Sequence, residues 1–244
     1  MAACAAVRRA SHARRVDSLA RVPTEASSNG RTADFGSAYE GSNPSASAKP
    51  SGARSANQRA DVKPLPMPAR LVVLALGPVP RALLVDVGEA LTAVYGAPVA
   101  LGAGQDRPGY AFNKDRNQYH STAILRRLSQ LRGAGEAPVL GVTDVDLFVP
   151  DAPFVFGEAD RASRSGVVSL SRLAHGPDGH PAEPERLKRR VQVESVHELG
   201  HLLGLSHCQD AHCAMFLSHK PSDSDRKSLG LCTSCRAALG LGAR

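Results

Sequence analysis

The stretch HELGHLLGLSHC, residues 197–208, carries the most specific pattern in the chain. His197 and His201 are four residues apart, so a helix through them places both imidazoles on one face, one turn apart. At this spacing two imidazole nitrogens can bind one zinc ion, while Glu198 stands beside them to accept a proton from water. We therefore predict a zinc-binding helix across this stretch.

The residues around the stretch support the helix and supply a third ligand. Pro184 suits a first helical turn, and apolar residues recur at near-helical intervals up to Leu203. Gly204 favours the end of the helix, and His207 follows three residues later. Three histidine ligands leave one tetrahedral position open, as in catalytic zinc sites. The alternative is a buried helix whose histidines are only hydrogen-bonded.

Four of the five cysteines gather near the C-terminus and predict a second metal site. They are Cys208, Cys213, Cys232 and Cys235. Four thiolates form a closed tetrahedral zinc site, which is structural rather than catalytic. Two disulfides are the alternative reading, which the absence of a secretion signal disfavours. In a rival assignment Cys208, not His207, is the third ligand of the first metal.

These motifs resemble the archaemetzincins, a branch of the metzincin metallopeptidases. The resemblance rests on HExxHxxGxxHC, on the following Cys-Ala-Met at 213–215 and on the CxxC pair, with further similar stretches at 111–128, 139–150 and 154–160. It implies His197, His201 and His207 on a catalytic zinc, Glu198 as general base, and Cys208, Cys213, Cys232 and Cys235 on a structural zinc. It also implies that Met215 is the Met-turn residue beneath the catalytic site, and that the chain is an aminopeptidase with two zinc ions.

Apolar patterns before the zinc motif predict alternating strands and helices. The predicted strands are residues 71–76, 98–101, 139–149, 154–158 and 166–173, and the predicted helices are 81–95 and 117–132. This order predicts an α/β fold with a twisted, mostly parallel sheet backed by helices. From the resemblance we assign FVFGEAD, residues 154–160, to an antiparallel edge strand that borders the cleft, although an ordinary sheet strand is the alternative.

Composition divides the chain into a tail and a domain. Residues 1–67 are rich in Ala, Ser, Arg and Pro, and we expect a disordered tail there. Residues 68–244 should form the metzincin-like domain, with a four-cysteine zinc subdomain over about 205–244. Residues 1–64 hold ten basic and five acidic residues, so the net charge of +7 is mostly a property of the tail. We therefore expect no nucleic-acid partner. The lack of a long apolar segment predicts no membrane partner. We also expect a cytoplasmic protein and a monomer.

The predicted activity is hydrolysis of peptide bonds with water activated by zinc and Glu198. A non-catalytic, zinc-stabilised peptide-binding module is the main alternative, although it would not need Glu198. A hydrolase of non-peptide amides is a third possibility, since zinc chemistry suits any acyl or amide bond. Among polar residues outside the motif, we expect loop roles for His175, His180, His212 and His219, and structural hydrogen bonds for Asp144 and Asp146.

Overall fold

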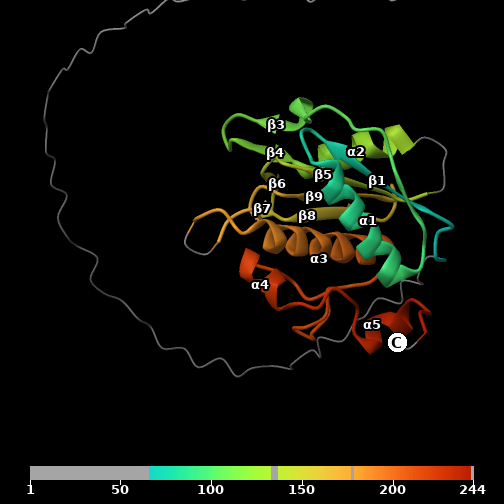
Figure 1. Cartoon of the computed structure of the whole chain (residues 1–244). Coiled ribbons are helices and arrows are strands. Elements are labelled where there is room, and N and C mark those ends of the chain that lie inside the picture. The colour runs from blue at the N-terminus through green and yellow to red at the C-terminus, as the bar shows by residue number, and fades with distance from the viewer. Residues whose placement is uncertain (1–65, 133–136, 177–178, 243–244) are drawn as a thin grey trace, which may run out of the picture. The chain divides into compact units, whose positions relative to one another are not determined.

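A computed structural model describes residues 66–132, 137–176 and 179–242, and its centre is a five-stranded sheet (Figure 1). The strands lie in the order β2 (Val99–Leu101), β1 (Leu71–Leu76), β5 (Val139–Thr143), β9 (Ser165–Ser169) and β8 (Gly157–Asp160). The first four pair in parallel, and β8 pairs antiparallel with β9 at the edge. The predicted α/β class, with a mostly parallel sheet and an antiparallel edge strand, is confirmed. The tail predicted over residues 1–67 lies almost wholly outside the described residues.

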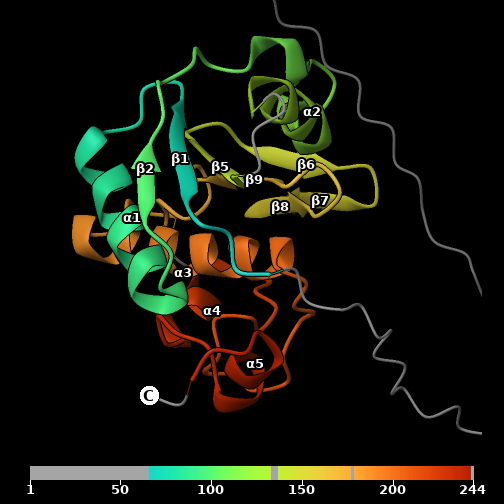
Figure 2. The ribbon, with the colours of Figure 1, turned by 90° about the vertical axis from the view of Figure 1, so that its right-hand side faces the viewer.

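Helices cover both faces of this sheet, which explains why its central strands are apolar on both sides. On one face lie α1 (Arg81–Tyr95) and α3 (Pro184–Leu202), and on the other lies α2 (Ser121–Arg132) (Figures 1 and 2). Alternate residues of β1 point to opposite faces, so Val73 packs with α1 and α3, and Leu74 packs with α2. Such two-sided burial is typical of parallel sheets.

Four short strands form a second, smaller sheet. Its strands are β3 (Phe112–Asn113), β4 (Gln118–His120), β6 (Leu147–Val149) and β7 (Ala152–Val155), in that order. A short 3₁₀ helix, η1 (Gly109–Ala111), precedes β3. Only the β4–β6 pair is parallel. The sequence pattern did not predict this sheet.

The second sheet corrects several predicted boundaries. The strand predicted over 139–149 is two strands, β5 and β6, because the chain bends at Asp144–Asp146 and passes from one sheet to the other. The strand predicted over 154–158 likewise divides at Phe156, so the edge strand is β8 rather than 154–158. The helix predicted over 117–132 begins at Ser121, since the residues before it form β4. The strand predicted over 166–173 ends at Ser169.

Helix α3 begins and ends where its sequence predicts. Proline occupies its first turn together with Glu185, whose charge suits a helix N-terminus. Leu203 caps the last turn, and Gly204 follows with φ of 102°, a backbone angle that a residue with a Cβ rarely adopts. The chain therefore turns sharply after the predicted zinc-binding helix.

The C-terminal segment packs beneath α3 on the side away from the sheet. It contains two short helices, α4 (Pro221–Arg226) and α5 (Thr233–Ala238) (Figures 1 and 2). An isolated bridge joins Cys208 to Phe216, and Cys213, Ala214 and Met215 between them are buried. The segment therefore lies where it can present backbone carbonyls to the end of α3.

Candidate metal centres

The structure brings the three predicted histidines together. One ring nitrogen from each of His197, His201 and His207 lies within 4.8 Å of the others. The Nε2 atoms of His197 and His201 are 3.0 Å apart. Helix α3 supplies the first two imidazoles, and the turn at Gly204 returns the chain so that His207 faces them. The rings of His197 and His207 stack with centroids 5.3 Å apart.

Backbone carbonyls fix which nitrogen each helical imidazole offers. The Nδ1 of His197 lies 2.8 Å from the Ala214 carbonyl, and the Nδ1 of His201 lies 2.8 Å from the Leu205 carbonyl. A carbonyl oxygen can only accept, so both Nδ1 atoms donate and both Nε2 atoms carry a lone pair. Two such lone pairs at 3.0 Å repel each other, and a cation bound by both nitrogens would remove this repulsion.

The donor set fits zinc. Two nitrogens bound tetrahedrally at about 2.05 Å from zinc would be about 3.3 Å apart, close to the separation of the two Nε2 atoms. Burial lowers the pKa of His197 to about 3 and also lowers the pKa of His201 and of His207. The imidazoles are therefore held neutral, which is the form that binds a metal. Cys208, the rival third ligand, lies in the cysteine cluster instead.

Glu198 is a buried carboxylate beside the imidazoles. Its side chain packs against Gly157 of β8 so closely that a Cβ on this glycine would lie 2.6 Å from Glu198 Oε1. Burial raises the pKa of Glu198 well above its usual value, and the negative charges of Glu194 and Glu158 raise it further. A carboxyl whose pKa is raised in this way is suited to take up and release a proton.

Met215 lies under the helix that carries the imidazoles. It is fully buried, and a Cβ on Gly200 would lie 2.3 Å from its Sδ, so this glycine gives the sulfur its place against α3. Ala214, the residue before it, supplies the carbonyl that orients His197. The Met-turn role of Met215 stays a prediction from the resemblance.

The four predicted cysteines form a second cluster. The Sγ atoms of Cys208, Cys213, Cys232 and Cys235 lie within 4.8 Å of one another, and all four are free thiols. The Sγ atoms of Cys208 and Cys232 are 3.7 Å apart, and tetrahedral zinc with bonds of about 2.3 Å would hold two sulfurs at about 3.8 Å. Burial and the charge of Cys213 raise the pKa of Cys235, so the group of thiolates needs a cation. The donor set fits a closed zinc site better than two disulfides.

Comparison with known proteins identifies the family. Residues 84–240 match the sequence model described as Peptidase family M54. The chain belongs to peptidase family M54. The predicted resemblance to the archaemetzincins is thereby confirmed, and with it a zinc-dependent metallopeptidase class.

Curated relatives and solved structures of the M54 family align over most of the domain. The archaemetzincin of Thermococcus kodakarensis is 35% identical over 175 residues, covering 69% of this chain and 94% of the relative. The crystal structure of a zinc-dependent peptidase from Methanocorpusculum labreanum aligns with a TM-score of 0.64 and 31% identity, over 69% of this chain and 99% of that one. The crystal structure of the Methanopyrus kandleri archaemetzincin aligns with a TM-score of 0.60 and 36% identity, over 70% and 93%.

Glu194 of α3 belongs to a buried network of charged and hydroxyl groups that the sequence analysis did not predict. Glu194 Oε1 accepts hydrogen bonds from Ser224 Oγ at 2.6 Å and Ser218 Oγ at 2.9 Å, and lies 3.3 Å from Lys227 Nζ. Both Glu194 and Lys227 are buried. Glu194 stands one turn before His197 and Glu198 on α3, a spacing that could have singled it out. Lys227 lies in a polar stretch with no such signal.

The remaining polar residues have structural partners in this M54 chain. Asp144 pairs with Arg107, and Asp146 pairs with Arg172 and accepts from Gln118. The loop roles predicted for His175 and His212 agree with their contacts to the carbonyls of Ser171 and Arg226.

His219 lies exposed in a bend before α4, as the predicted loop role requires, and its backbone N–H donates to Asp223. The pKa of His207 is lowered chiefly by burial, then by the charge of Lys227, and His219 adds to this effect.

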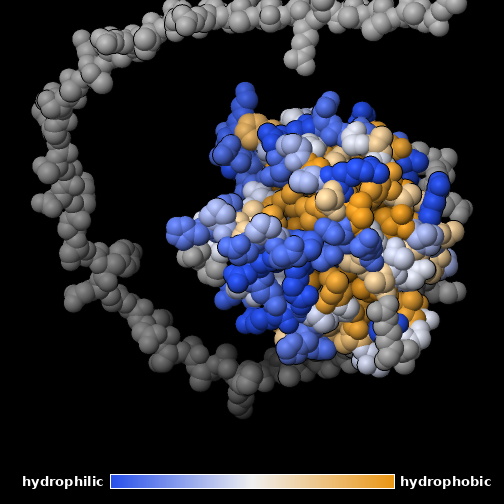
Figure 3. Space-filling view, viewed as in Figure 1, coloured by the Kyte–Doolittle hydropathy of each residue, from blue (hydrophilic) through white to orange (hydrophobic). Residues whose placement is uncertain are grey.

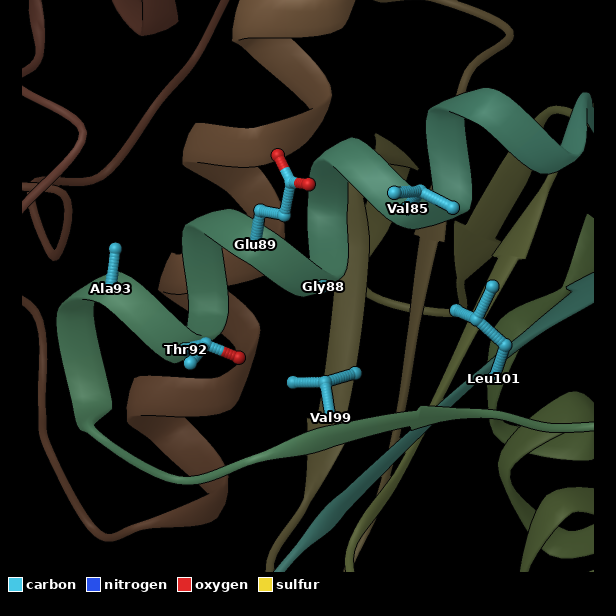
Figure 4. Close-up of a pocket in the computed structure, with 7 residues that line it drawn as sticks. All are labelled: Val85, Gly88, Glu89, Thr92, Ala93, Val99 and Leu101. Atoms are coloured by element: carbon cyan, nitrogen blue, oxygen red, sulfur yellow. The ribbon is translucent and has the colours of Figure 1, made fainter.

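A shallow apolar pocket of about 400 Å³ lies away from the histidines, at the opposite edge of the sheet. Its lining comes from α1 and β2: Val85, Gly88, Glu89, Thr92, Ala93, Val99 and Leu101 (Figure 4). Apolar side chains gather over the α1 face of the molecule (Figure 3). Glu89 is the one titratable residue among those that line this pocket, so the pocket offers no pair of groups for acid–base catalysis. The candidate catalytic residues are therefore those of the histidine site. Within the described part of the chain, no helix is long and apolar enough to cross a membrane.

Proposed function

We propose that this M54 protein is an aminopeptidase with Glu198 as its general base and one zinc held by His197, His201 and His207. The observation that carries this proposal is the convergence of three neutral imidazoles beside a buried carboxylate of raised pKa. When bound there, zinc supplies Lewis acidity, since it polarises a carbonyl and lowers the pKa of water. We assign a second, structural zinc to Cys208, Cys213, Cys232 and Cys235.

The chain's own residues handle the proton. Glu198 lies on the same helix as His197 and His201, and its carboxylate packs against the edge strand. In this position it accepts the proton of the attacking water and delivers it to the leaving amine. Its raised pKa makes the second transfer feasible, because a carboxyl with an ordinary pKa would hold the proton poorly at neutral pH.

The edge strand β8 offers a place for extended substrate. The Ser169 N–H donates to the Phe156 carbonyl, so alternation along the antiparallel ladder directs the N–H and C=O groups of Gly157 and Ala159 outward. A peptide can pair with such an edge by β-addition. Since Gly157 also touches Glu198, a peptide on this edge would pass the general base.

The proposal is tested with a mixed peptide library analysed by mass spectrometry after incubation with the zinc-loaded protein. The matched control is Glu198→Gln, which keeps the shape and hydrogen bonding of the side chain but removes the base. Loss of single N-terminal residues with the wild type only would support the aminopeptidase. Internal cuts would make the protein an endopeptidase. Identical spectra from both proteins would favour the peptide-binding module or the non-peptide amide hydrolase.

A further inference from the structure

Arg161 lies directly after β8, at the end of the strand edge that is proposed to bind substrate. Its guanidinium packs against Gly204, where a Cβ would lie 3.2 Å from Arg161 Nη1 and 3.3 Å from Cζ. Gly204 belongs to the turn after α3, between His201 and His207 in the sequence. The positive charge of Arg161 is therefore held beside the turn that joins two predicted metal ligands.

The side chain of Arg161 is on the α3 face of the sheet, together with the proposed general base. A Cβ at Gly157 would meet Glu198, and Ala159 packs among apolar residues of α1 and α3. Alternate residues of a strand share a face, so Arg161 continues this row. Strand β8 packs along α3 (Figure 1), and the row leads from Glu198 towards the end of the helix.

The turn after β8 holds Arg161 in this position. The carboxylate of Asp160 accepts hydrogen bonds from the backbone N–H groups of Ala162 and Ser163 at 3.0 and 3.2 Å. The Arg164 N–H donates to the Arg161 carbonyl at 3.3 Å. The acidic neighbour of Arg161 is thus used within the turn, where it fixes the backbone that carries the guanidinium.

A pocket of about 660 Å³ adjoins the same end of α3. Its lining includes Leu202 and Leu203 of that end, together with Arg70 and Arg164. Among the described residues that line it there is no carboxylate. The end of α3 therefore presents positive charge to a ligand, on both sides of the turn at Gly204.

We propose that Arg161 binds a carboxylate of the peptide substrate and so selects acidic or short peptides. This inference rests on the proposed peptidase function. Gly204 is six residues beyond Glu198, which is about 9 Å at the rise of a helix, and an extended peptide advances about 3.3 Å per residue. The carboxylate is therefore about three residues from the cleaved bond, on an acidic side chain or at the C-terminus. The planar guanidinium suits it, since it can form two parallel hydrogen bonds with a carboxylate.

Binding to a protein that cannot turn over tests the inference apart from activity. In the zinc-loaded Glu198→Gln variant, isothermal titration calorimetry measures a neutral peptide with a free N-terminus and an amidated C-terminus. It then measures peptides with one glutamate at each position in turn, and shorter peptides with a free C-terminal carboxylate. We expect the best carboxylate peptide to bind at least about 10-fold more tightly than the neutral one, as charge-assisted hydrogen bonds provide.

Adding Arg161→Gln should bring these affinities within about twofold of each other. Arg161→Lys should keep part of the preference, because the charge remains but the paired hydrogen bonds are lost. Arg164→Gln is the matched control, since it removes the same charge from the same turn and should leave the preference intact. Zinc content and the affinity for the neutral peptide should not change in any of these variants.

A glutamate or free carboxylate that gives no gain in affinity would overturn the inference. Equal losses in Arg161→Gln and Arg164→Gln would also overturn it, because the effect would then come from overall charge. A fall in zinc content and in the affinity for every peptide would show instead that Arg161 only stabilises the end of α3. A gain with glutamate assigns the site to an acidic side chain, and a gain only with the free C-terminus assigns it to the terminal carboxylate.

The outcome is independent of the library experiment. Cleavage by the wild type, with no effect of Arg161→Gln on the preference, would reject only the carboxylate site. A preference that is lost in Arg161→Gln, without any cleavage by the wild type, would reject the peptidase function and keep the carboxylate site.

Discussion

Single residues between His197 and His207 carry the proposed chemistry, and a few residues elsewhere set their geometry. The carbonyls of Ala214 and Leu205 accept hydrogen bonds from the Nδ1 atoms of His197 and His201. The Nε2 atom of each imidazole is therefore left to bind a metal. Gly157 leaves the space into which Glu198 packs. The site therefore depends on small groups that carry no charge and that a search for catalytic residue types would overlook.

Gly157→Ala tests the contact between the edge strand and the general base. The new methyl carbon would lie 2.6 Å from Glu198 Oε1 and 2.7 Å from the Val167 carbonyl, so Glu198 must move. We expect at least about a 10-fold loss of kcat/KM, because a displacement of about 1 Å can cost about 100-fold. Zinc content should not change. Full activity would show that the contact does not position Glu198.

The buried imidazoles predict how stability responds to acid. Burial lowers the pKa of His197 to about 3, whereas an unfolded histidine has a pKa of 6.5. Between these values the unfolded chain binds a proton that the folded chain does not, so stability falls as the pH falls below about 6.5. In zinc-stripped protein, denaturant unfolding from pH 7 to 5 should show this slope, up to about 1.4 kcal/mol per pH unit for one group. His197→Gln should give a shallower slope, and equal slopes would contradict the prediction.

At the scale of elements, α3 and β8 pack directly against each other, and Glu198 and Gly157 meet at their contact. Helix α3 is long enough to span the sheet and packs against α1 on the same face, where Tyr95 Oη donates to the Val196 carbonyl at 2.6 Å. The strand β8 contributes an outer edge and ends in a turn capped by Asp160. Helix α3 and strand β8 are thus each held by contacts that do not involve the predicted metal ligands.

Ala159→Pro tests the role of the β8 edge. The alternation along β8 directs the N–H of Ala159 away from β9, so a proline removes a donor to substrate rather than a bond of the ladder. We expect a large rise in KM for peptides, with the melting temperature and the zinc content nearly unchanged. Parallel losses of activity and stability would mean that β8 has only a structural role.

Lys227→Met tests the link between α3 and the C-terminal segment. Without Lys227 the buried carboxylate of Glu194 has no cation, and breaking such a pair costs about 3 kcal/mol. The free energy of unfolding, measured with denaturant, should fall by about this amount. The double variant Glu194→Gln with Lys227→Met is the control and should recover part of the loss. No recovery would show that the two residues act independently.

On the scale of the whole molecule, the cysteine cluster lies in a segment with little regular structure. Between α3 and α5 the chain runs through short turns, one bridge and the small helix α4. This segment provides both the third imidazole and the carbonyl that orients His197. A metal bound by the cysteines would therefore support the active site from below the helix.

Cys235→Ser tests this support. Binding of a structural zinc is itself folding free energy, so loss of a ligand should lower the melting temperature and the activity together. His201→Ala, which removes a ligand of the other site, should lose one zinc and the activity but remain folded. Metal analysis and thermal unfolding of the two variants would check this. An unchanged melting temperature in Cys235→Ser would reject the structural role.

Sequence spacing alone predicted that His197, Glu198 and His201 share one helix, and it predicted the regular elements beside them. The offsets of His197, Glu198 and His201 lie within one helix, where a fixed 3.6-residue period determines which side chains share a face. The same local periodicity placed the helix at 81–95 and the strand at 71–76. The family resemblance rested on these local motifs as well.

Only the tertiary structure decided the features that depend on residues far apart in the chain. The division of 139–149 between two sheets follows from the partners that β5 and β6 find, which no local pattern encodes. The pairing of Glu194 with Lys227, and the contact of Glu198 with Gly157, join segments that meet only after folding. Periodicity is a property of neighbouring residues, whereas strand partners and buried ion pairs depend on how the whole chain packs.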